Sequence, residues 1–142
     1  MNIAFFLLPK SEVITTTLQA TLRQTLERME YHRYTAVPIL SDQGHYVGTV
    51  TEGDLLWFLK NSNGIDFDHS HRHTLSEVPL RVQNKPVHIH AEMVDLIDLA
   101  KVQNFVPVVD DSDKFIGIVR RSEIIDYCAK QMFRAPSTAG EM

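Results

Sequence analysis

An internal repeat is the feature that most constrains the fold of this 142-residue chain. Three pairs of residues share one offset of 69 residues: Pro38 with Pro107, Gly48 with Gly117, and Asp54 with Glu123. Chance similarity rarely keeps register across several landmarks, so the chain contains two copies of one structural unit. One unit of this size buries too little apolar surface to be stable alone, and the two copies are therefore expected to pack together.

Both copies predict the same order of elements. A helix with its apolar side chains on one face comes first, over 22–29 in one copy and 93–100 in the other. A short apolar strand, a polar turn, a second strand and a closing apolar helix follow. Further strands near 13–15 and 87–89 make each copy β-α-β-β-α. The sequence thus predicts an α+β fold, with small sheets flanked by helices and the copies packed as a pseudo-two-fold pair.

Changes in composition along the chain set the expected boundaries. The N-terminal run 3–8 is apolar but too short to span a bilayer, and it lacks the features of a signal peptide, so it is interpreted as packing onto the core or a partner subunit. The expected units are an N-terminal packing segment (1–10), the first repeat (11–60), a polar irregular linker (61–82), the second repeat (83–133) and a flexible tail (134–142).

Charge and cysteine content narrow the class of function. The chain has 14 Lys and Arg against 18 Asp and Glu, whereas sequence-independent binding of nucleic acid needs a basic face. Its one cysteine, Cys128, allows no intramolecular disulfide, which suits a reducing cytoplasm. No nucleophile motif, phosphate-binding loop or Cys–His pair is present. We therefore expect a cytoplasmic protein that is not an enzyme, needs no cofactor and contacts neither nucleic acid nor membrane.

The segment from Gly48 to Asp54 places a hydroxyl and a carboxylate at the start of a helix. Thr51 lies where the strand ends, and the free N–H groups there favour a phosphate. Asp54, one turn further, can accept hydrogen bonds from ribose hydroxyls. The same two residues also suit plain N-capping, with Asp54 as the acid of a capping box. Residue chemistry alone leaves these two interpretations equal.

Over residues 11–130 the chain resembles the CBS domains, arranged as a tandem pair or Bateman module. The resemblance rests on the Gly-h-x-Thr-x-x-Asp pattern at 48–54 (h is hydrophobic), on the Tyr34-Thr35-Ala36-Val37-Pro38 strand and on the second copy. It implies a regulatory protein that binds an adenine nucleotide, forms a homodimer and signals to an unidentified partner protein. The nucleotide we expect is cyclic di-AMP, and the alternatives are a sensor of AMP, ADP or ATP and a ligand-free dimerisation module.

In CBS pairs each cleft combines the signature of one repeat with the first strand and pre-proline segment of the other. The resemblance therefore implies one cleft made of Ile14, Thr15, Tyr34, Thr35, Ala36, Arg120, Arg121 and Glu123. Arginines suit phosphates and a tyrosine can stack on a base, as in stand-alone bacterial CBS pairs that bind cyclic di-AMP. A second possible cleft implied by the resemblance comprises Thr49, Thr51, Asp54, Val87, Phe105 and Val106.

Three further features have a structural and a functional interpretation. His69, His71 and His73 alternate and could share a face around zinc, but without a nearby Cys or carboxylate cluster they are interpreted as solvated, so no metal site is predicted. Arg33, next to Tyr34, suits either the nucleotide cleft or a solvated helix end. Trp57 lies in a helix that is apolar on nearly all sides and is expected to be buried, and a dimer seam there agrees with the family.

Overall fold

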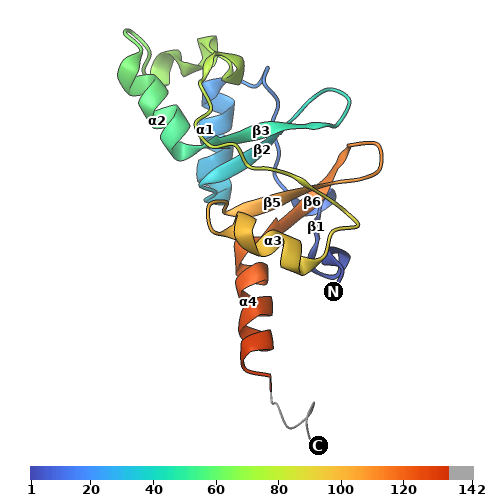
Figure 1. Ribbon diagram of the computed structural model, residues 1–142. Coiled ribbons are helices and arrows are strands. Elements are labelled where there is room, and N and C mark those ends of the chain that lie inside the picture. Colours follow the sequence, from blue (N-terminus) through green and yellow to red (C-terminus); the bar gives the residue numbers. More distant parts are fainter. Residues whose placement is uncertain (135–142) are drawn as a thin grey trace, which may run out of the picture.

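The computed structural model describes residues 1–134 as two β-hairpins with helices on both sides (Figure 1). The α-helices are α1 (Leu22–His32), α2 (Glu52–Asn61), α3 (Met93–Ala100) and α4 (Arg121–Met132). The strands are β1 (Leu8–Pro9), β2 (Ala36–Leu40), β3 (Tyr46–Thr51), β4 (Val87–His88), β5 (Phe105–Val109) and β6 (Phe115–Arg120). The 3-10 helices are η1 (Ile3–Phe6), η2 (Lys10–Glu12), η3 (Phe67–Arg72) and η4 (Leu75–Glu77).

The two hairpins are equivalent in register as well as in sequence. Strand β2 pairs with β3 and β5 with β6, both antiparallel, and Val37 opposite Val50 has its counterpart in Val106 opposite Val119. Each hairpin also has a register irregularity at the end of its first strand. Helices α1 and α2 lie beside one hairpin, and α3 and α4 beside the other (Figure 1). The predicted α+β pair of repeats is confirmed.

The strand expected near 13–15 is not formed, and this prediction was wrong. Only Thr16 makes a parallel bridge, to Ile39. Its N–H donates to the Pro38 carbonyl at 3.0 Å and its carbonyl accepts from the Leu40 N–H at 2.8 Å. A single residue satisfies both free groups of the hairpin edge there, and the chain then turns towards the N-cap of α1 at Thr21. In the second repeat the expected strand exists as β4, parallel to β5.

The N-terminal segment packs onto the second repeat. Strand β1 pairs antiparallel with β6, giving a four-stranded sheet in the order β1-β6-β5-β4. Ile3 is fully buried among the core side chains of that repeat, and the Met93 N–H donates to the Met1 carbonyl at 2.9 Å. The first ten residues thus add a strand and a core side chain to the repeat farthest from them in sequence.

The segment between the repeats is more ordered than its polarity suggests. It contains η3 and η4, and Leu75 and Val78 are buried in the core of the first repeat. The Leu22 N–H donates to the His73 carbonyl at 2.9 Å, so the segment also satisfies a free group at the start of α1. Two apolar residues three apart gave too weak a periodic signal to predict this packing.

Each repeat has its own core, and a third cluster joins the two. The third cluster contains Leu40, Phe105, Phe115 and Ile118. The Phe115 ring stacks on Tyr46 with centroids 6.4 Å apart, and the Phe115 N–H donates to the Gly44 carbonyl at 2.9 Å. The repeats are therefore connected both along the hairpins and at their tips.

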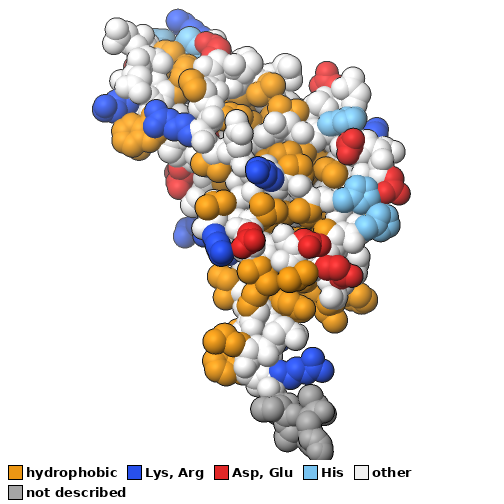
Figure 2. Space-filling model, in the orientation of Figure 1, with side chains coloured by type: hydrophobic (Ala, Val, Ile, Leu, Met, Phe, Trp, Pro, Cys, Tyr) orange, Lys and Arg blue, Asp and Glu red, His pale blue; other side chains and the backbone are white. Residues whose placement is uncertain are grey.

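The surface differs between the helical side and the hairpin tips (Figure 2). Apolar side chains cover much of the visible face, whereas histidine and acidic side chains gather along the edge where the hairpin tips lie. Across residues 1–134, none of the helices combines the length and the apolar character needed to cross a bilayer. The predicted flexible tail, apart from Arg134, lies outside the described residues.

Candidate functional site

A cleft between the repeats forms a cavity of about 270 Å³. It is lined by Leu8, Val13, Ile14, Arg33, Tyr34, Thr35, Ala36, Pro38, Asn104, Phe105, Ile118 and Arg120. Five of the residues predicted for the Arg120 cleft therefore line one cavity: Ile14, Tyr34, Thr35, Ala36 and Arg120. The predicted combination of the second repeat's signature with the first repeat's pre-proline segment is the arrangement found here.

The end of helix α1 positions the first-repeat side of this cleft. Arg33 adopts the left-handed conformation, with φ of 58°, and so turns the chain out of the helix. The Tyr34 N–H then donates to the Met29 carbonyl at 3.0 Å. The His32 ring stacks on the Tyr34 ring with centroids 5.7 Å apart and planes 18° apart. Arg33 lines the cleft and is also the exposed C-cap residue of α1, so both interpretations of it agree with the structure.

Strand β6 and helix α4 position the second-repeat side. Arg120 is the residue that precedes α4, and its side chain makes no cap hydrogen bond. Its guanidinium contacts the Glu123 carboxylate at 3.3 Å, and the Arg120 side chain is 52% exposed. Such an exposed pair is weak, so the guanidinium can exchange its carboxylate partner for an anionic ligand.

Three predicted members of this cleft do not line the cavity. Arg121 turns towards the backbone: its Nε donates to the Gln103 carbonyl at 2.9 Å and its N–H to the Asn104 carbonyl at 3.0 Å. Glu123 reaches the cleft only through its contact with Arg120. The Thr15 carbonyl instead accepts a hydrogen bond from Arg28 at 2.7 Å. Arg121 therefore holds the pre-proline segment of the second repeat in place.

Sequence reasoning placed Asn104 and Phe105 in the other cleft, but both line this one. The segments that precede Pro38 and Pro107 lie close together between the two clefts, so a residue of either segment can face either cleft. The register of β5 against β6 places Phe105 opposite Arg120, and both residues line this cavity. No feature of the sequence alone distinguishes the two sides.

The residues predicted for the second cleft do not meet around one cavity. Thr51 and Asp54 form a complete capping box, with hydrogen bonds of 3.1 and 2.9 Å. The other Asp54 oxygen accepts from the Arg81 N–H at 3.0 Å, and Asp54 is only 2% exposed. Of the two interpretations of this motif, the structure shows the capping one, because both carboxylate oxygens already accept backbone hydrogen bonds.

The remaining residues of that set are also engaged elsewhere. Thr49 is fully buried and shares a 2.6 Å hydrogen bond with the Tyr46 hydroxyl, whose pKa is raised by burial. Val106 is buried in the second-repeat core, and Val87 pairs with Val108. A small cavity of about 240 Å³ beside Asp54 is lined by α2 and the linker and includes none of Val87, Phe105 and Val106, the residues expected from the second repeat.

The Gln103 side chain explains part of this difference between the clefts. By the 69-residue offset it corresponds to Tyr34. Its amide accepts from the Lys85 N–H at 2.8 Å and donates to the Lys85 and Phe105 carbonyls, both at 3.2 Å. Gln103 thus binds the backbone of Lys85 and Phe105, whereas Tyr34, its counterpart in the first repeat, lines a cavity.

The histidines at 69, 71 and 73 do not converge on a common point. His69 contacts the Asp66 carboxylate at 2.6 Å, and His73 contacts Glu77 at 2.9 Å. The hydrogen bond from His69 lowers the pKa of Asp66, and the one from His73 lowers the pKa of Glu77. The 3-10 helix η3 breaks the strand-like alternation on which the zinc interpretation depended.

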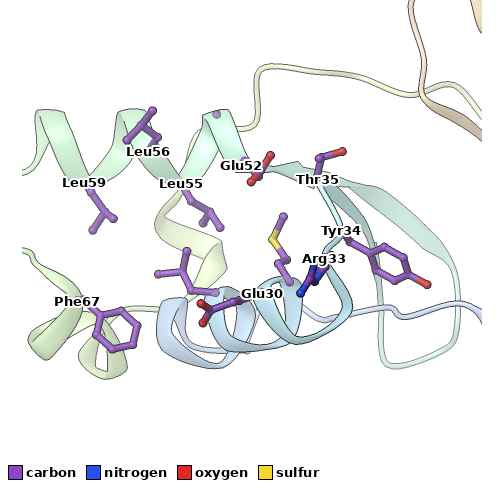
Figure 3. Close-up of a pocket in the computed structure, with 12 residues that line it drawn as sticks. Glu30, Arg33, Tyr34, Thr35, Glu52, Leu55, Leu56, Leu59 and Phe67 are labelled. Atoms are coloured by element: carbon purple, nitrogen blue, oxygen red, sulfur yellow. The ribbon is translucent and has the colours of Figure 1, made fainter.

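A larger groove of about 1010 Å³ lies between α1 and α2 (Figure 3). Figure 3 shows Leu55 and Leu59 of α2 facing α1, with Phe67 at one end and Tyr34 at the other. Glu30, Arg33 and Glu52 are its charged lining residues. Two acidic groups and an apolar wall make this groove a poor host for a phosphate and a suitable surface for apolar side chains.

Comparison with protein families matches the CBS domain twice, over residues 7–61 and 75–130. The chain belongs to the CBS domain family. A CBS domain-containing protein of Dictyostelium discoideum is 25% identical over 138 residues, covering 91% of this chain and 93% of the relative. CBS pairs of solved structure are similar in fold at lower identity.

Nucleotide complexes are among those solved CBS pairs. The CbpB protein of Listeria monocytogenes, in complex with c-di-AMP, is 18% identical with a TM-score of 0.77, covering 92% of this chain and 96% of that chain. The CBS protein CBSX2, in complex with AMP, is 19% identical with a TM-score of 0.72, covering 92% and 98%. The likeness establishes a shared CBS-pair fold.

Proposed function

We propose that this CBS pair is a regulatory protein that binds an adenine nucleotide, cyclic di-AMP, in the cleft between Tyr34 and Arg120. The observation that carries the proposal is one cavity lined by two arginines, Arg33 and Arg120, together with an aromatic ring. Arginine binds phosphate oxygens with two parallel hydrogen bonds, and an aromatic ring can stack on a base. Apolar side chains of Ile14 and Phe105 complete a surface for adenine.

The charges around the cleft favour a phosphodiester over a polyphosphate. Arg120 lies near Glu123, and the whole chain has a net charge of −4. Cyclic di-AMP distributes two single negative charges over two phosphates, which two separate arginines can each neutralise. A triphosphate concentrates more negative charge in one place, close to the Glu123 carboxylate. The c-di-AMP complex of Listeria CbpB supports the same choice, and the AMP complex of CBSX2 keeps AMP as the second candidate.

Binding in this cleft offers a route to regulation. Its walls come from both repeats, with Tyr34 in one and Arg120 in the other. A ligand that contacts both walls stabilises one relative position of the repeats, and a partner protein can distinguish that state. The role is regulatory, without turnover of the nucleotide.

The proposal predicts that cyclic di-AMP stabilises the protein. Ligand at a hundredfold excess over its dissociation constant should add about 2.7 kcal/mol to the free energy of unfolding, seen as a rise in melting temperature. AMP, ADP and ATP are compared at the same concentration, and calorimetry gives the affinity of each ligand that acts. A rise with AMP or ATP but not cyclic di-AMP would identify an energy-charge sensor. No rise with any nucleotide would leave a ligand-free dimerisation module.

We also propose that the protein forms a homodimer through its closing helices. Leu56 of α2 and Ile125 of α4 stand at equivalent positions of the two repeats, and each is 57% exposed. Trp57, expected to be buried, is 39% exposed beside Leu56. Large exposed apolar side chains on both closing helices are typical of an interface, and a second copy offers the same pair of helices in return.

Sedimentation velocity tests the dimer. The wild-type chain should sediment with twice the mass of one chain, and the Leu56→Asp/Ile125→Asp variant should sediment as a monomer, because each aspartate leaves a charge in an apolar interface. Val47→Asp is the matched control, since Val47 is 46% exposed but lies in the β2–β3 hairpin. A wild-type monomer, or a double variant that still dimerises, contradicts the proposal.

A further inference from the structure

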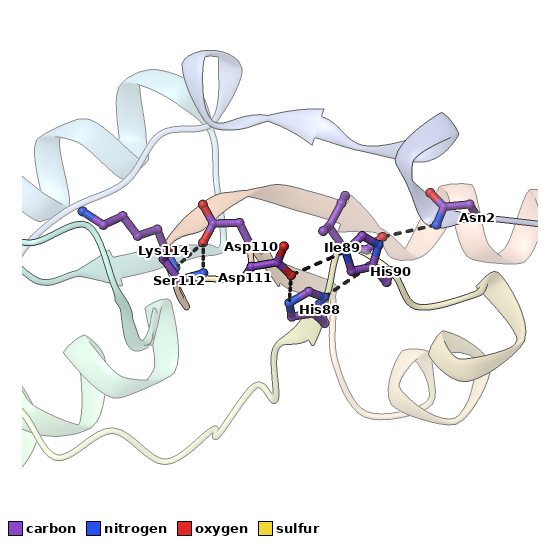
Figure 4. Close-up of polar contacts among 8 residues, drawn as sticks. All are labelled: Asn2, His88, Ile89, His90, Asp110, Asp111, Ser112 and Lys114. Carbon is purple, nitrogen blue, oxygen red and sulfur yellow. Dashed lines mark hydrogen bonds and ion pairs between the residues drawn. The ribbon is translucent and has the colours of Figure 1, made fainter.

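Two histidines and an aspartate converge at the tip of the β5–β6 hairpin (Figure 4). The Nε2 atoms of His88 and His90 lie 2.9 and 3.4 Å from the same oxygen, Oδ1 of Asp111. The two imidazole rings stack with centroids 4.9 Å apart. Within residues 1–134, this is the one group of three histidine, cysteine or acidic side chains whose ligand atoms all lie within 4.8 Å of one another.

The backbone holds both histidines in place. Strand β4 ends at His88, and the next N–H, of Ile89, donates to the Val109 carbonyl at 2.9 Å. The Ile89 carbonyl accepts from the Asn2 side chain at 3.3 Å, and the Ala91 N–H donates to the His88 carbonyl at 2.9 Å. The segment that carries the two rings is therefore tied to β5 on one side and to the N-terminal segment on the other, as Figure 4 shows for Asn2.

Hydrogen bonds within the hairpin turn fix the backbone next to Asp111. The carboxylate of its neighbour Asp110 accepts from the N–H groups of Ser112 and Lys114 at 2.8 and 3.0 Å. These bonds commit Asp110 to the turn and leave Asp111, whose side chain is 81% exposed, facing the two rings (Figure 4). The three groups therefore meet because two separately fixed segments of backbone lie side by side.

We propose that His88, His90 and Asp111 bind a zinc ion, with water in the remaining position. In a tetrahedral site with metal–ligand bonds of about 2.0–2.1 Å, neighbouring ligand atoms are separated by about 3.3 Å. The observed separations of 2.9 and 3.4 Å lie on either side of that value. Imidazole suits zinc and its neighbours in the transition series, whereas magnesium and calcium prefer oxygen ligands.

Zinc binding requires one adjustment in this cluster. The backbone N–H of His90 lies 3.4 Å from Nδ1 of His88, a long hydrogen bond in which Nδ1 is the acceptor, so a ring proton would stand on Nε2. Coordination through Nε2 moves that proton to Nδ1 or to solvent. The long bond is the weakest contact of the segment, so losing it costs little.

Isothermal titration of the untagged full chain with Zn²⁺ tests the site without any nucleotide, so its result is independent of the proposed function. One zinc per chain is expected. The His88→Ala/His90→Ala variant should bind at least tenfold more weakly, since even the outer partners of metal ligands are worth that much. Asp111→Asn, which retains the shape but not the charge, should also weaken binding. His90 and Asp111 are exposed and His88 is only half-buried, so a melting curve should show that the fold is retained.

The matched control is His69→Ala/His73→Ala, which removes the same number of histidines from the linker. Its affinity for zinc should stay within twofold of the wild type. Equal loss in both double variants, or loss in the control alone, would place the zinc elsewhere and overturn the proposal. So would a wild-type chain that does not bind zinc, or one that binds Ca²⁺ as well as Zn²⁺.

Discussion

Arg120→Ala is expected to lower the affinity for cyclic di-AMP about a hundredfold. A hydrogen bond to a charged partner contributes about 1.5–3 kcal/mol, so losing a two-pronged contact to a phosphate removes about 3 kcal/mol, and each 1.4 kcal/mol is a factor of ten. The Arg120 side chain lines the cleft, and the one contact that its guanidinium loses when the ligand binds is the exposed one with Glu123. Calorimetric titration of the variant with cyclic di-AMP measures the loss.

Substitutions of two other arginines serve as controls that show whether the loss is specific to the cleft. Arg81→Ala is the matched control, because Arg81 lines the small cavity beside Asp54 instead, and its affinity should stay within twofold of the wild type. Arg121→Ala should reduce stability more than affinity, since its Nε supports the Gln103 carbonyl. If Arg81→Ala abolishes binding and Arg120→Ala does not, the nucleotide lies in the Asp54 cleft and the assignment is wrong.

Gly117→Ala is expected to destabilise the protein by about 3–5 kcal/mol. Gly117 has a φ of 155° and lies opposite Pro9, where β1 pairs with β6. A Cβ at this position would meet the Leu8 carbonyl oxygen and approach the Leu7 Cδ1 atom at 2.9 Å. Backbone strain and overpacking each cost about 1–3 kcal/mol, and the Leu8 backbone cannot move without breaking the strand pair. Urea unfolding with a fitted free energy measures the loss.

The repeat provides the control for this substitution. Gly48 corresponds to Gly117, but a Cβ there meets only the Leu80 Cδ1 atom, at 3.1 Å. A flexible side chain can move by a few tenths of an ångström, so Gly48→Ala should cost about 1 kcal/mol or less. Equal losses at the two positions would mean that β1 does not pair with β6 as described. A small loss at Gly117 would mean that the N-terminal segment detaches readily.

The paired landmarks made the architecture predictable. The shared offset of Pro38 and Pro107 and of Gly48 and Gly117 predicted two equal hairpins, and β2–β3 and β5–β6 have matching registers. The linker was predicted to be irregular because it is polar. Leu75 and Val78 alone gave no signal that it completes the core of the first repeat. A single bridge at Thr16 stands where a whole strand was expected, because this one residue pairs with both the Pro38 carbonyl and the Leu40 N–H at the edge of β2.

For the candidate sites too, the sequence predicted local features but not which side chains meet in space. Sequence neighbours and repeat offsets determined the order of elements, the capping geometry open to Thr51 and Asp54, and the general position of the Tyr34–Arg120 cleft. Only the tertiary structure decided that Arg120 lines the cavity while Arg121 turns to the backbone. It also placed Asp111 beside His88. Periodicity and capping depend on residues a few positions apart, which a sequence displays directly. The convergence of side chains depends on how separate segments pack, which no local pattern encodes.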